Sequence, residues 1–170
     1  ELSNYSNYGK YSDHVVPGEV MMSKLQQNNL DGNIMTENDL QRIGYLPEER
    51  GLYNSMTVEA HAMFLARLRG LSKKDAKAKM DDWFDRFQVN DWRRKRIEEL
   101  SKGMAQKVQF ICTVLHEPQL LILDEPFSGF DPVNVELIKK ELLEMKAAGK
   151  TIILSTHNMK SVEEICDRAC

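Results

Sequence analysis

The chain has 170 residues, of which 42% are hydrophobic and 29% are charged, and its formal net charge at pH 7 is −3. A chain of this length can build one hydrophobic core that buries about 70% of its unfolded surface. Its longest apolar runs fall far short of the roughly 18 residues that indicate a membrane-spanning helix, and no signal peptide is recognisable, so we expect no membrane span within it.

Residues 1–42 contain no recognisable phosphate-binding loop. Such a loop, G-x-x-x-x-G-K-[ST], cradles phosphate groups with its backbone N–H groups and its lysine. The nearest approach is Asn4–Ser12, in which Gly9 and Lys10 match but Tyr11 replaces the serine or threonine. Only about six residues then separate Lys10 from the turn at Pro17, too few for the helix that follows such a loop. We therefore interpret the Gly-Lys pair as a chance match.

A short strand is predicted from Ile43, because an apolar segment runs up to Pro47, which breaks it into a loop that opens with Glu48. Two helices are predicted to follow, over Thr57–Arg69 and Lys73–Phe87. The middle of the chain is therefore expected to be helical.

Four consecutive basic residues occupy Arg93–Arg96. A basic run can indicate a nucleic-acid partner, but the net charge is −3 and two acids, Glu98 and Glu99, follow directly. We favour a solvated or subunit-facing helix turn, and we expect no nucleic-acid partner.

A strongly amphipathic helix is predicted to begin after Ser101, which has the side chain of an N-cap, with Gly103 as a small residue in the first turn. Such a helix start offers free N–H groups and the positive end of the helix dipole to an anion. The apolar residues at helical spacing are Met104, Val108, Ile111, Cys112 and Leu115. Cys112 lies on this apolar face, so we expect a buried, reduced thiol there.

The segment Leu120–Pro126 reads LLILDEP and predicts a short strand, buried on both faces, that ends in Asp124 and Glu125. In open α/β sheets ligands bind at the carboxyl edge of the strands. An Asp at the end of an apolar strand is the Walker-B arrangement that holds Mg²⁺ for a nucleoside triphosphate. Taken alone, a strand that ends in a turn of Asp, Glu and Pro is common.

A helix from Pro132 to about Ala148, with Asp131 as its N-cap, separates this strand from a second one over Thr151–Leu154. His157 follows the second strand, and a further helix is predicted over Met159–Asp167. A strand, a helix and a parallel strand form a right-handed crossover, which would bring His157 to the same edge of the sheet as the two carboxylates.

Taken in order, four segments resemble the motifs of the ATP-binding cassette (ABC) ATPases. They are Leu100–Met104 as the signature, LLILDEP as the Walker B motif, Ser128–Asp131 as the D-loop and His157 as the switch histidine. The signature is usually LSGGQ and here reads LSKGM. The segment LPEERGLY, which begins at Leu46, resembles the Q-loop region of exporter-type bacterial members, with Glu48 in place of the Gln.

The resemblance, which runs from Ile43 to Cys170, implies an α/β fold, a P-loop NTPase-like parallel sheet core with an inserted helical subdomain, truncated at both ends. On this interpretation residues 1–42 are an atypical N-terminal remnant of the core and residues 43–56 hold the strand and the Q-loop. Residues 57–100 form the helical subdomain, and residues 101–170 carry the signature helix, Walker B motif, D-loop and switch histidine.

The same resemblance implies an ATP-hydrolysing subunit of an ABC transporter that uses ATP and Mg²⁺. It would work with a transmembrane permease subunit and a second nucleotide-binding domain, as a homo- or heterodimer, on the inner face of the cell membrane. Asp124 would hold Mg²⁺ through water, and Glu125 and His157 would be catalytic. The family motifs assign nucleotide contacts to Glu48, Ser101, Lys102, Gly103, Met104 and Asp131.

Two alternatives remain open at this point. One is a soluble ABC ATPase without a membrane partner, although such proteins usually carry two cassettes or long insertions. The other is a non-catalytic module that supplies only the signature half-site, because a chain without a phosphate-binding loop cannot anchor a triphosphate itself.

Overall fold

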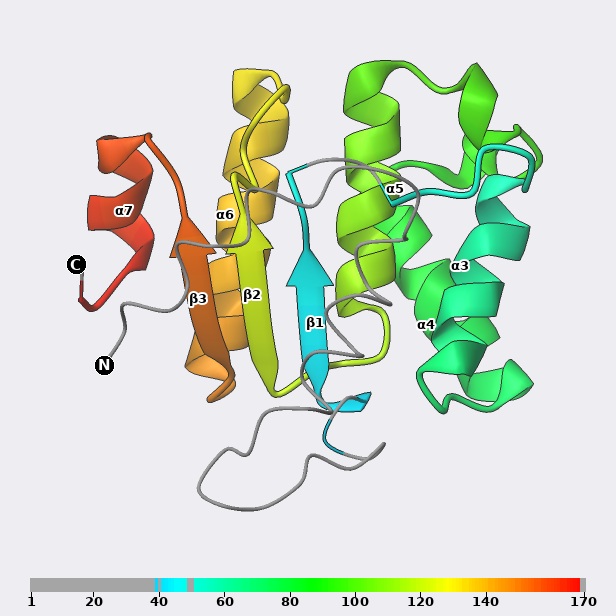
Figure 1. Ribbon diagram of the computed structural model, residues 1–170, viewed down its shortest axis with the longest axis horizontal. Helices are drawn as coiled ribbons and strands as arrows, with labels where there is room; N and C mark the ends of the chain where they lie inside the picture. The colour runs from blue at the N-terminus through cyan, green and yellow to red at the C-terminus, as the bar shows by residue number, and fades with distance from the viewer. Residues whose placement is uncertain (1–38, 40, 49–50, 169–170) are drawn as a thin grey trace, which may run out of the picture.

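The computed structural model describes residues 39, 41–48 and 51–168, in which a three-stranded parallel sheet carries helices on one face (Figure 1). The strands lie in the order β1-β2-β3, and their bounds are β1 Ile43–Leu46, β2 Leu120–Asp124 and β3 Thr151–Ser155. The helices are α3 Val58–Leu68, α4 Lys73–Arg86, α5 Lys102–Val114, α6 Pro132–Ala147 and α7 Met159–Ile165, with 3₁₀ turns η2 Asn90–Trp92 and η3 Ile97–Glu99. The predicted α/β architecture is confirmed.

The helices begin where the sequence places their caps. Ser101, Asp131 and Asn158 each accept a hydrogen bond from a backbone N–H in the first turn of the helix that follows. Such side-chain caps satisfy N–H groups that have no partner within the helix. Helix α7 ends at Ile165, two residues before the predicted end, because Cys166 already has an extended backbone.

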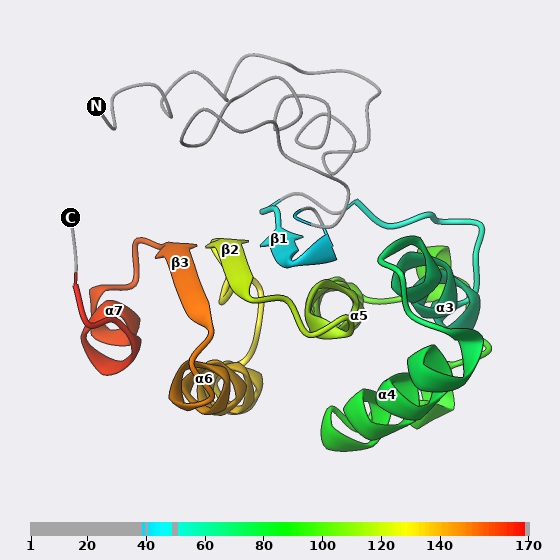
Figure 2. The ribbon, with the colours of Figure 1, turned by 90° about the horizontal axis from the view of Figure 1, so that it is seen from below.

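The burial of β2 differs from the prediction. Leu121 and Leu123 are buried, whereas Leu120 and Ile122 are only half-buried. The described helices all lie on the face of the sheet that Leu121 and Leu123 contact (Figure 2), so only every second residue of the strand is covered by them. The apolar run was predicted to be buried on both faces, and this prediction is wrong for the described residues.

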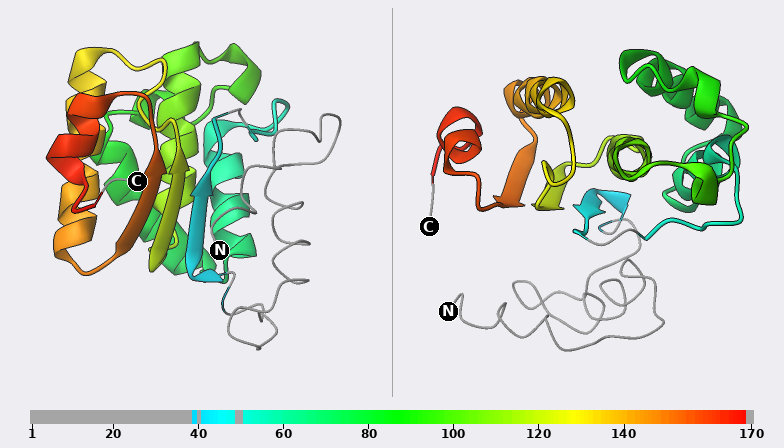
Figure 3. Two further views of the ribbon diagram at one scale, coloured as in Figure 1. Left: turned by 60° about the vertical axis from the view of Figure 1, so that its left-hand side comes forward. Right: turned by 90° about the horizontal axis from the view of Figure 1, so that it is seen from above.

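Helix α5 lies against the sheet beside β1, and α3 and α4 form a helical unit beyond it (Figures 2 and 3). An aromatic cluster joins this unit to α5: the ring of Phe110 lies 5.5 Å from that of Phe87 and 6.3 Å from that of Trp83, between centroids. Burying an aromatic side chain of this size contributes about 1.5–3 kcal/mol. The helical unit is therefore held to the sheet layer through α5, the helix that begins at Ser101.

Candidate functional site

Glu125 and His157 meet at the carboxyl edge of the sheet. Glu125 has a left-handed backbone, with φ of 46°, directly after the end of β2. Its Oε1 accepts hydrogen bonds from the backbone N–H of His157 and from the ring Nδ1 of His157, both at 2.9 Å. Its Oε2 accepts a hydrogen bond from the hydroxyl of Thr156 at 3.1 Å. The predicted convergence of the two strand ends is therefore present.

These contacts keep Glu125 ionised. Burial acts to raise the pKa of its carboxyl group, but the hydrogen bonds from His157 and Thr156 outweigh burial and lower the pKa below the ordinary value of 4.5. The side chain of His157 is 87% exposed, so its second ring nitrogen faces solvent. The pair thus presents an anchored carboxylate next to an accessible imidazole.

Asp124 lies on the sheet face opposite the helices, because its side chain alternates with those of Leu121 and Leu123 along β2. One of its carboxylate oxygens accepts a hydrogen bond from the hydroxyl of Ser155. Burial and the negative charge of Asp124 together raise the pKa of Tyr45 on β1. Asp124 therefore lies at the end of the central strand, hydrogen-bonded to Ser155 at the end of β3 and close enough to Tyr45 on β1 to act on it electrostatically.

A second group of candidate residues forms where the start of α5 meets the loop after β2. Ser101 caps α5 by accepting from the N–H of Met104 at 3.3 Å, and Lys102 is exposed beside it. A Cβ on Gly103 would meet the carbonyl oxygen of Gly129 at 3.7 Å, an ordinary contact distance. The signature segment and the D-loop segment are thus neighbours.

Gln106 ties this second group together by donating a hydrogen bond to the carbonyl oxygen of Ser128. Gly129 has φ of 77°, and a Cβ there would come within 2.7 Å of Gln106 Oε1 and 2.9 Å of Lys102 Cε. The left-handed backbone therefore favours glycine here, whereas the nearby atoms are the ends of flexible side chains that can move. Asp131 ends this loop as the cap of α6, and the N–H of Asn134 lowers its pKa.

Glu48 is exposed at the start of the loop after β1. Among the described residues, no hydrogen bond or ion pair ties it to either group. The backbone just before it is anchored to α5, since Gln109 donates to the carbonyl oxygen of Pro47 at 3.1 Å. The candidate site residues that the structure describes therefore form two groups, and Glu48 is hydrogen-bonded to neither. The nearest sequence match to a phosphate-binding loop, Asn4–Ser12, lies outside the described residues.

The sequence analysis missed several residues that support the site: Ser155, Thr156, Gln106 and Gln109. Ser155 and Thr156 extend the strand that leads to His157, and two polar residues at that edge were a signal that they could face the carboxylates. Gln109 is buried on a mainly apolar face of α5, one turn before Thr113. A glutamine there needs a hydrogen-bond partner, which is a sequence signal for a backbone contact.

The donor set at the edge fits a magnesium ion that is bound together with a nucleotide. Mg²⁺ usually takes one or two carboxylates and keeps waters or phosphate oxygens as its other ligands. Asp124 and Glu125 offer such carboxylates. Within the described ranges, no group of three or more His, Cys, Asp or Glu side chains could hold a metal ion by itself. A protein-only metal site therefore does not fit these residues.

The sequence profile of the family described as "ABC transporter" matches residues 9–128, more than half of the chain. The chain is 54% identical over 129 residues to the uncharacterized ABC transporter ATP-binding protein YhaQ of Bacillus subtilis, an alignment that covers 76% of this chain and 43% of that protein. It is 36% identical over 128 residues to the ABC transporter ATP-binding protein NatA of the same organism, which covers 75% of this chain and 52% of NatA. The chain thus spans about half the length of the curated relatives it matches.

A solved structure of an ATP binding subunit of an ABC transporter superposes with a TM-score of 0.76 at 30% identity, covering 88% of this chain and 68% of that one. The likeness therefore extends to the arrangement of the sheet and the helices. None of the helices in the described part of the chain has the length and apolar character needed to cross a membrane.

Proposed function

Because the chain belongs to the ABC transporter family of ATP-binding subunits, we propose that it binds and hydrolyses ATP with Mg²⁺ and couples hydrolysis to substrate movement through a separate transmembrane permease. The observation that carries this proposal is the Glu125 carboxylate, fixed by His157 and Thr156 directly after Asp124. A general base must be ionised and held in place at the reacting group. Glu125 meets both requirements.

Each residue of the group at the carboxyl edge of the sheet, Asp124, Glu125 and His157, has its own proposed role. Asp124 holds Mg²⁺ through water, and Mg²⁺ when bound neutralises charge that develops on the phosphates. Glu125 accepts a hydrogen bond from the attacking water and orients it. His157 keeps Glu125 in place with its backbone N–H and its Nδ1. In the imidazolium form its outer ring nitrogen also carries a proton and would donate it in a hydrogen bond to the γ-phosphate. Glu48 contacts the metal or its water from the end of the loop after β1.

We assign the second group to the nucleotide of an opposite protomer. The start of α5 offers backbone N–H groups and a positive dipole end to phosphate oxygens. Ser101, Lys102, Gly103 and Met104 lie in that first turn, and Asp131 stands near the seam between the protomers. This assignment requires a second nucleotide-binding domain, in a homodimer or a heterodimer.

The permease is proposed to dock on the start of the helical unit, residues 57–100, beside the loop after Glu48. Beside this loop, α3 carries the apolar side chain of Phe64, which is 43% exposed. The ring of Tyr53 packs edge-on against Phe64 at 5.8 Å between centroids. Exposed apolar groups of this kind favour a protein partner. Through that partner the chain would lie on the inner face of the cell membrane.

Calorimetric titration of the purified chain with Mg-ATP tests the proposal, with Lys10→Ala and Glu125→Gln as variants. Saturable binding that Lys10→Ala abolishes and Glu125→Gln preserves, with turnover lost in Glu125→Gln, would support an ATPase that acts by itself. Failure to bind at millimolar Mg-ATP would refute catalysis by this chain alone.

A second candidate function is favoured by the missing G-x-x-x-x-G-K-[ST] sequence: the chain completes the site of an intact ABC ATP-binding subunit by supplying only its signature half-site. This candidate predicts that the chain stimulates ATP hydrolysis by an intact subunit and that Ser101→Arg removes the stimulation. Equal rates with and without the chain would refute it.

A further inference from the structure

Two segments of the helical region that lie far apart in the sequence are hydrogen-bonded along their backbones. One comprises residues 54–59, which lead into α3, and the other comprises residues 93–98, which connect η2 to η3. An isolated antiparallel bridge pairs Thr57 with Arg96. Four backbone N–H groups donate across the pair at 2.9–3.2 Å: Val58 to Lys95, Glu59 to Arg93, Ile97 to Met56 and Glu98 to Asn54.

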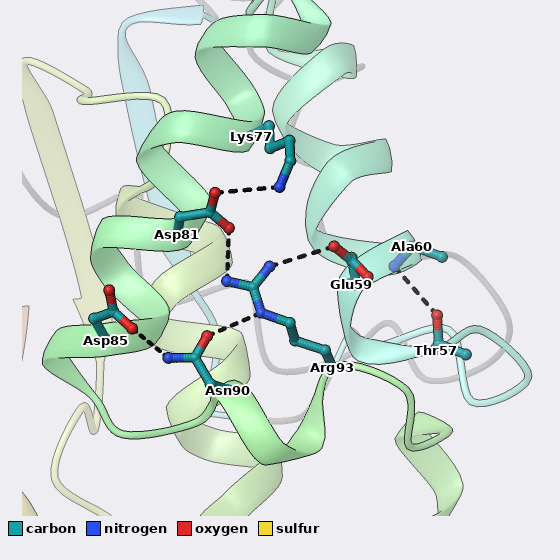
Figure 4. A network of polar contacts seen from close by, with 8 residues as sticks. All are labelled: Thr57, Glu59, Ala60, Lys77, Asp81, Asp85, Asn90 and Arg93. Carbon is teal, nitrogen blue, oxygen red and sulfur yellow. Dashed lines mark hydrogen bonds and ion pairs between the residues drawn. The ribbon is translucent and has the colours of Figure 1, made fainter.

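The side chain of Arg93 fixes this pair of segments to both helices of the helical unit (Figure 4). Its guanidinium donates to Glu59 on α3 at 3.3 Å and to Asp81 on α4 at 2.6 Å. Its Nε donates to the side chain of Asn90 at 2.9 Å. The guanidinium also lies over the ring of Phe84, 4.8 Å from the centroid. Arg93 thus joins α3, α4 and η2 at one point.

The basic run was predicted to be a solvated or subunit-facing helix turn, and the solvated alternative is wrong for Arg93. Its side chain is 21% exposed, whereas Arg94, Lys95 and Arg96 are exposed. The hydrogen bond from Arg93 is the main reason why the pKa of Asp81 lies below its ordinary value. The guanidinium spreads its donors over a rigid, planar fork, whereas a lysine would offer one compact ammonium that cannot reproduce this geometry toward Glu59, Asp81 and Asn90.

The segment that Arg93 anchors leads directly into the signature. Ile97, only 4% exposed, begins η3, and Leu100 connects η3 to the cap of α5, Ser101. On the other side, residues 54–59 continue the loop after Glu48. The position of Ser101 relative to that loop therefore depends on the bonds between the two segments.

We propose that Arg93 is a positioning residue, which holds residues 93–98 against residues 54–59 and thereby sets the position of Ser101 relative to the proposed permease-docking surface. The link between docking and the signature rests on the proposed function, whereas the positioning of Ser101 can be measured on the chain alone. The hydrogen bonds between residues 54–59 and residues 93–98 connect the proposed docking surface to Ser101 without involving the sheet edge.

The experiment compares Arg93→Gln and Arg93→Lys with Arg94→Gln, a matched change at the exposed neighbour. Hydrogen exchange of individual amides is followed for Ile97, Glu98 and Met104, with Leu142 in the core of α6 as the internal reference. We expect Arg93→Gln to speed exchange of the first three amides by about tenfold, because charge-assisted hydrogen bonds are lost. Arg93→Lys should recover only part of the protection, and Arg94→Gln should change exchange less than twofold.

A general loss of stability would speed exchange at Leu142 by the same factor, and this result would overturn the proposal. Unchanged exchange at Ile97, Glu98 and Met104 would overturn it as well. If Arg93→Gln does not fold, the same comparison with Arg93→Lys decides, because lysine keeps the charge and loses the fork.

A functional readout separates this proposal from the proposed function. Stimulation of an intact ABC ATP-binding subunit is measured against concentration of the chain. A mispositioned Ser101 lowers the plateau of stimulation, whereas a smaller folded fraction only shifts the half-saturating concentration. If the unaltered chain gives no stimulation, the half-site function fails, and hydrogen exchange still decides the role of Arg93.

Discussion

Gly44 on β1 offers a direct test of how α5 is held against the sheet. A Cβ at this position would lie 2.8 Å from the carbonyl oxygen of Thr113, and 2.9 Å from both Leu121 Cδ2 and Pro118 Cγ. Two of these three neighbours, a backbone oxygen on α5 and a proline ring, cannot rotate away. Gly44→Ala must therefore push α5 or the segment after it away from β1.

Overpacking of a buried site costs about 1–3 kcal/mol. Replacing glycine also restricts the unfolded chain, which offsets this cost by about 0.4–1 kcal/mol. With the middle of each range, the net loss of unfolding free energy for Gly44→Ala should be about 1.3 kcal/mol. At roughly 2–4 °C per kcal/mol for a chain of this size, Tm should fall by about 3–5 °C.

Urea unfolding followed by circular dichroism and by tryptophan fluorescence measures this change, and coincident transitions would justify a two-state analysis. Gly103→Ala is the matched control, because the nearest atom to its Cβ would be 3.7 Å away and the residue lies in a helix. Alanine there should be neutral or should stabilise by up to about 1 kcal/mol. Equal unfolding midpoints for the two variants would refute the packing argument.

Three further predictions follow from the titratable groups. Burial lowers the pKa of His61 to about 4, so protonation of this histidine favours the unfolded chain. As pH falls from 6.5 toward 4, the unfolding free energy of the protein should drop by on the order of 3 kcal/mol. His61→Leu should remove this part of the pH dependence of the urea midpoint. Burial raises the pKa of Cys112 to about 12, so peptide-resolved thiol labelling of the native chain should modify Cys166 and spare Cys112 until denaturant is added; equal labelling rates would contradict this. The lowered pKa of Asp131 makes its cap stabilising above its ordinary pKa of 3.8 and progressively lost as pH falls through the folded value; Asp131→Asn should keep the cap and flatten the acid limb of the unfolding curve, and an unchanged limb would count against this.

The sequence predicts those features of the structure that depend on residues close together along the chain. The caps of α5, α6 and α7 are short polar side chains that accept hydrogen bonds from N–H groups three residues away. The strands are apolar runs, and the crossover rule then places their ends at one edge. The meeting of Glu125 with His157 could therefore be predicted from the sequence.

The contacts that the sequence did not reveal join residues brought together only by packing. Gln106 bonds to Ser128 across a loop, and Arg93 bonds to Asp81 on another helix. A basic run looks the same in the sequence whether its carboxylate partners are on a neighbouring helix or absent. The covered face of β2 was also misjudged, because an apolar run does not reveal on which side of the strand helices lie.

The two groups of the candidate site are held mainly by different hydrogen bonds, and they meet at one backbone bond, from the N–H of Ser128 to the carbonyl oxygen of Glu125 at 3.0 Å. Glu125 and His157 are fixed by hydrogen bonds between the ends of β2 and β3. Ser101 depends on α5, the helix whose Gln106 and Gln109 also hold the D-loop and the backbone before Glu48.

A change that displaces α5 should therefore disturb the signature, the D-loop and the loop after β1 together, while the side-chain hydrogen bonds of Glu125 stay intact. Residues in contact usually couple, whereas distant sites without shared partners are additive within about 0.3–0.5 kcal/mol. Gln106→Ala and Thr156→Ala should couple weakly, because only the backbone hydrogen bond from Ser128 to Glu125 joins their partners, whereas Gln106→Ala and Gln109→Ala, one turn apart on the same helix, should couple more strongly. Coupling between Gln106 and Thr156 as large as that between the two glutamines would mean that the sheet edge and the signature helix form one cooperative unit.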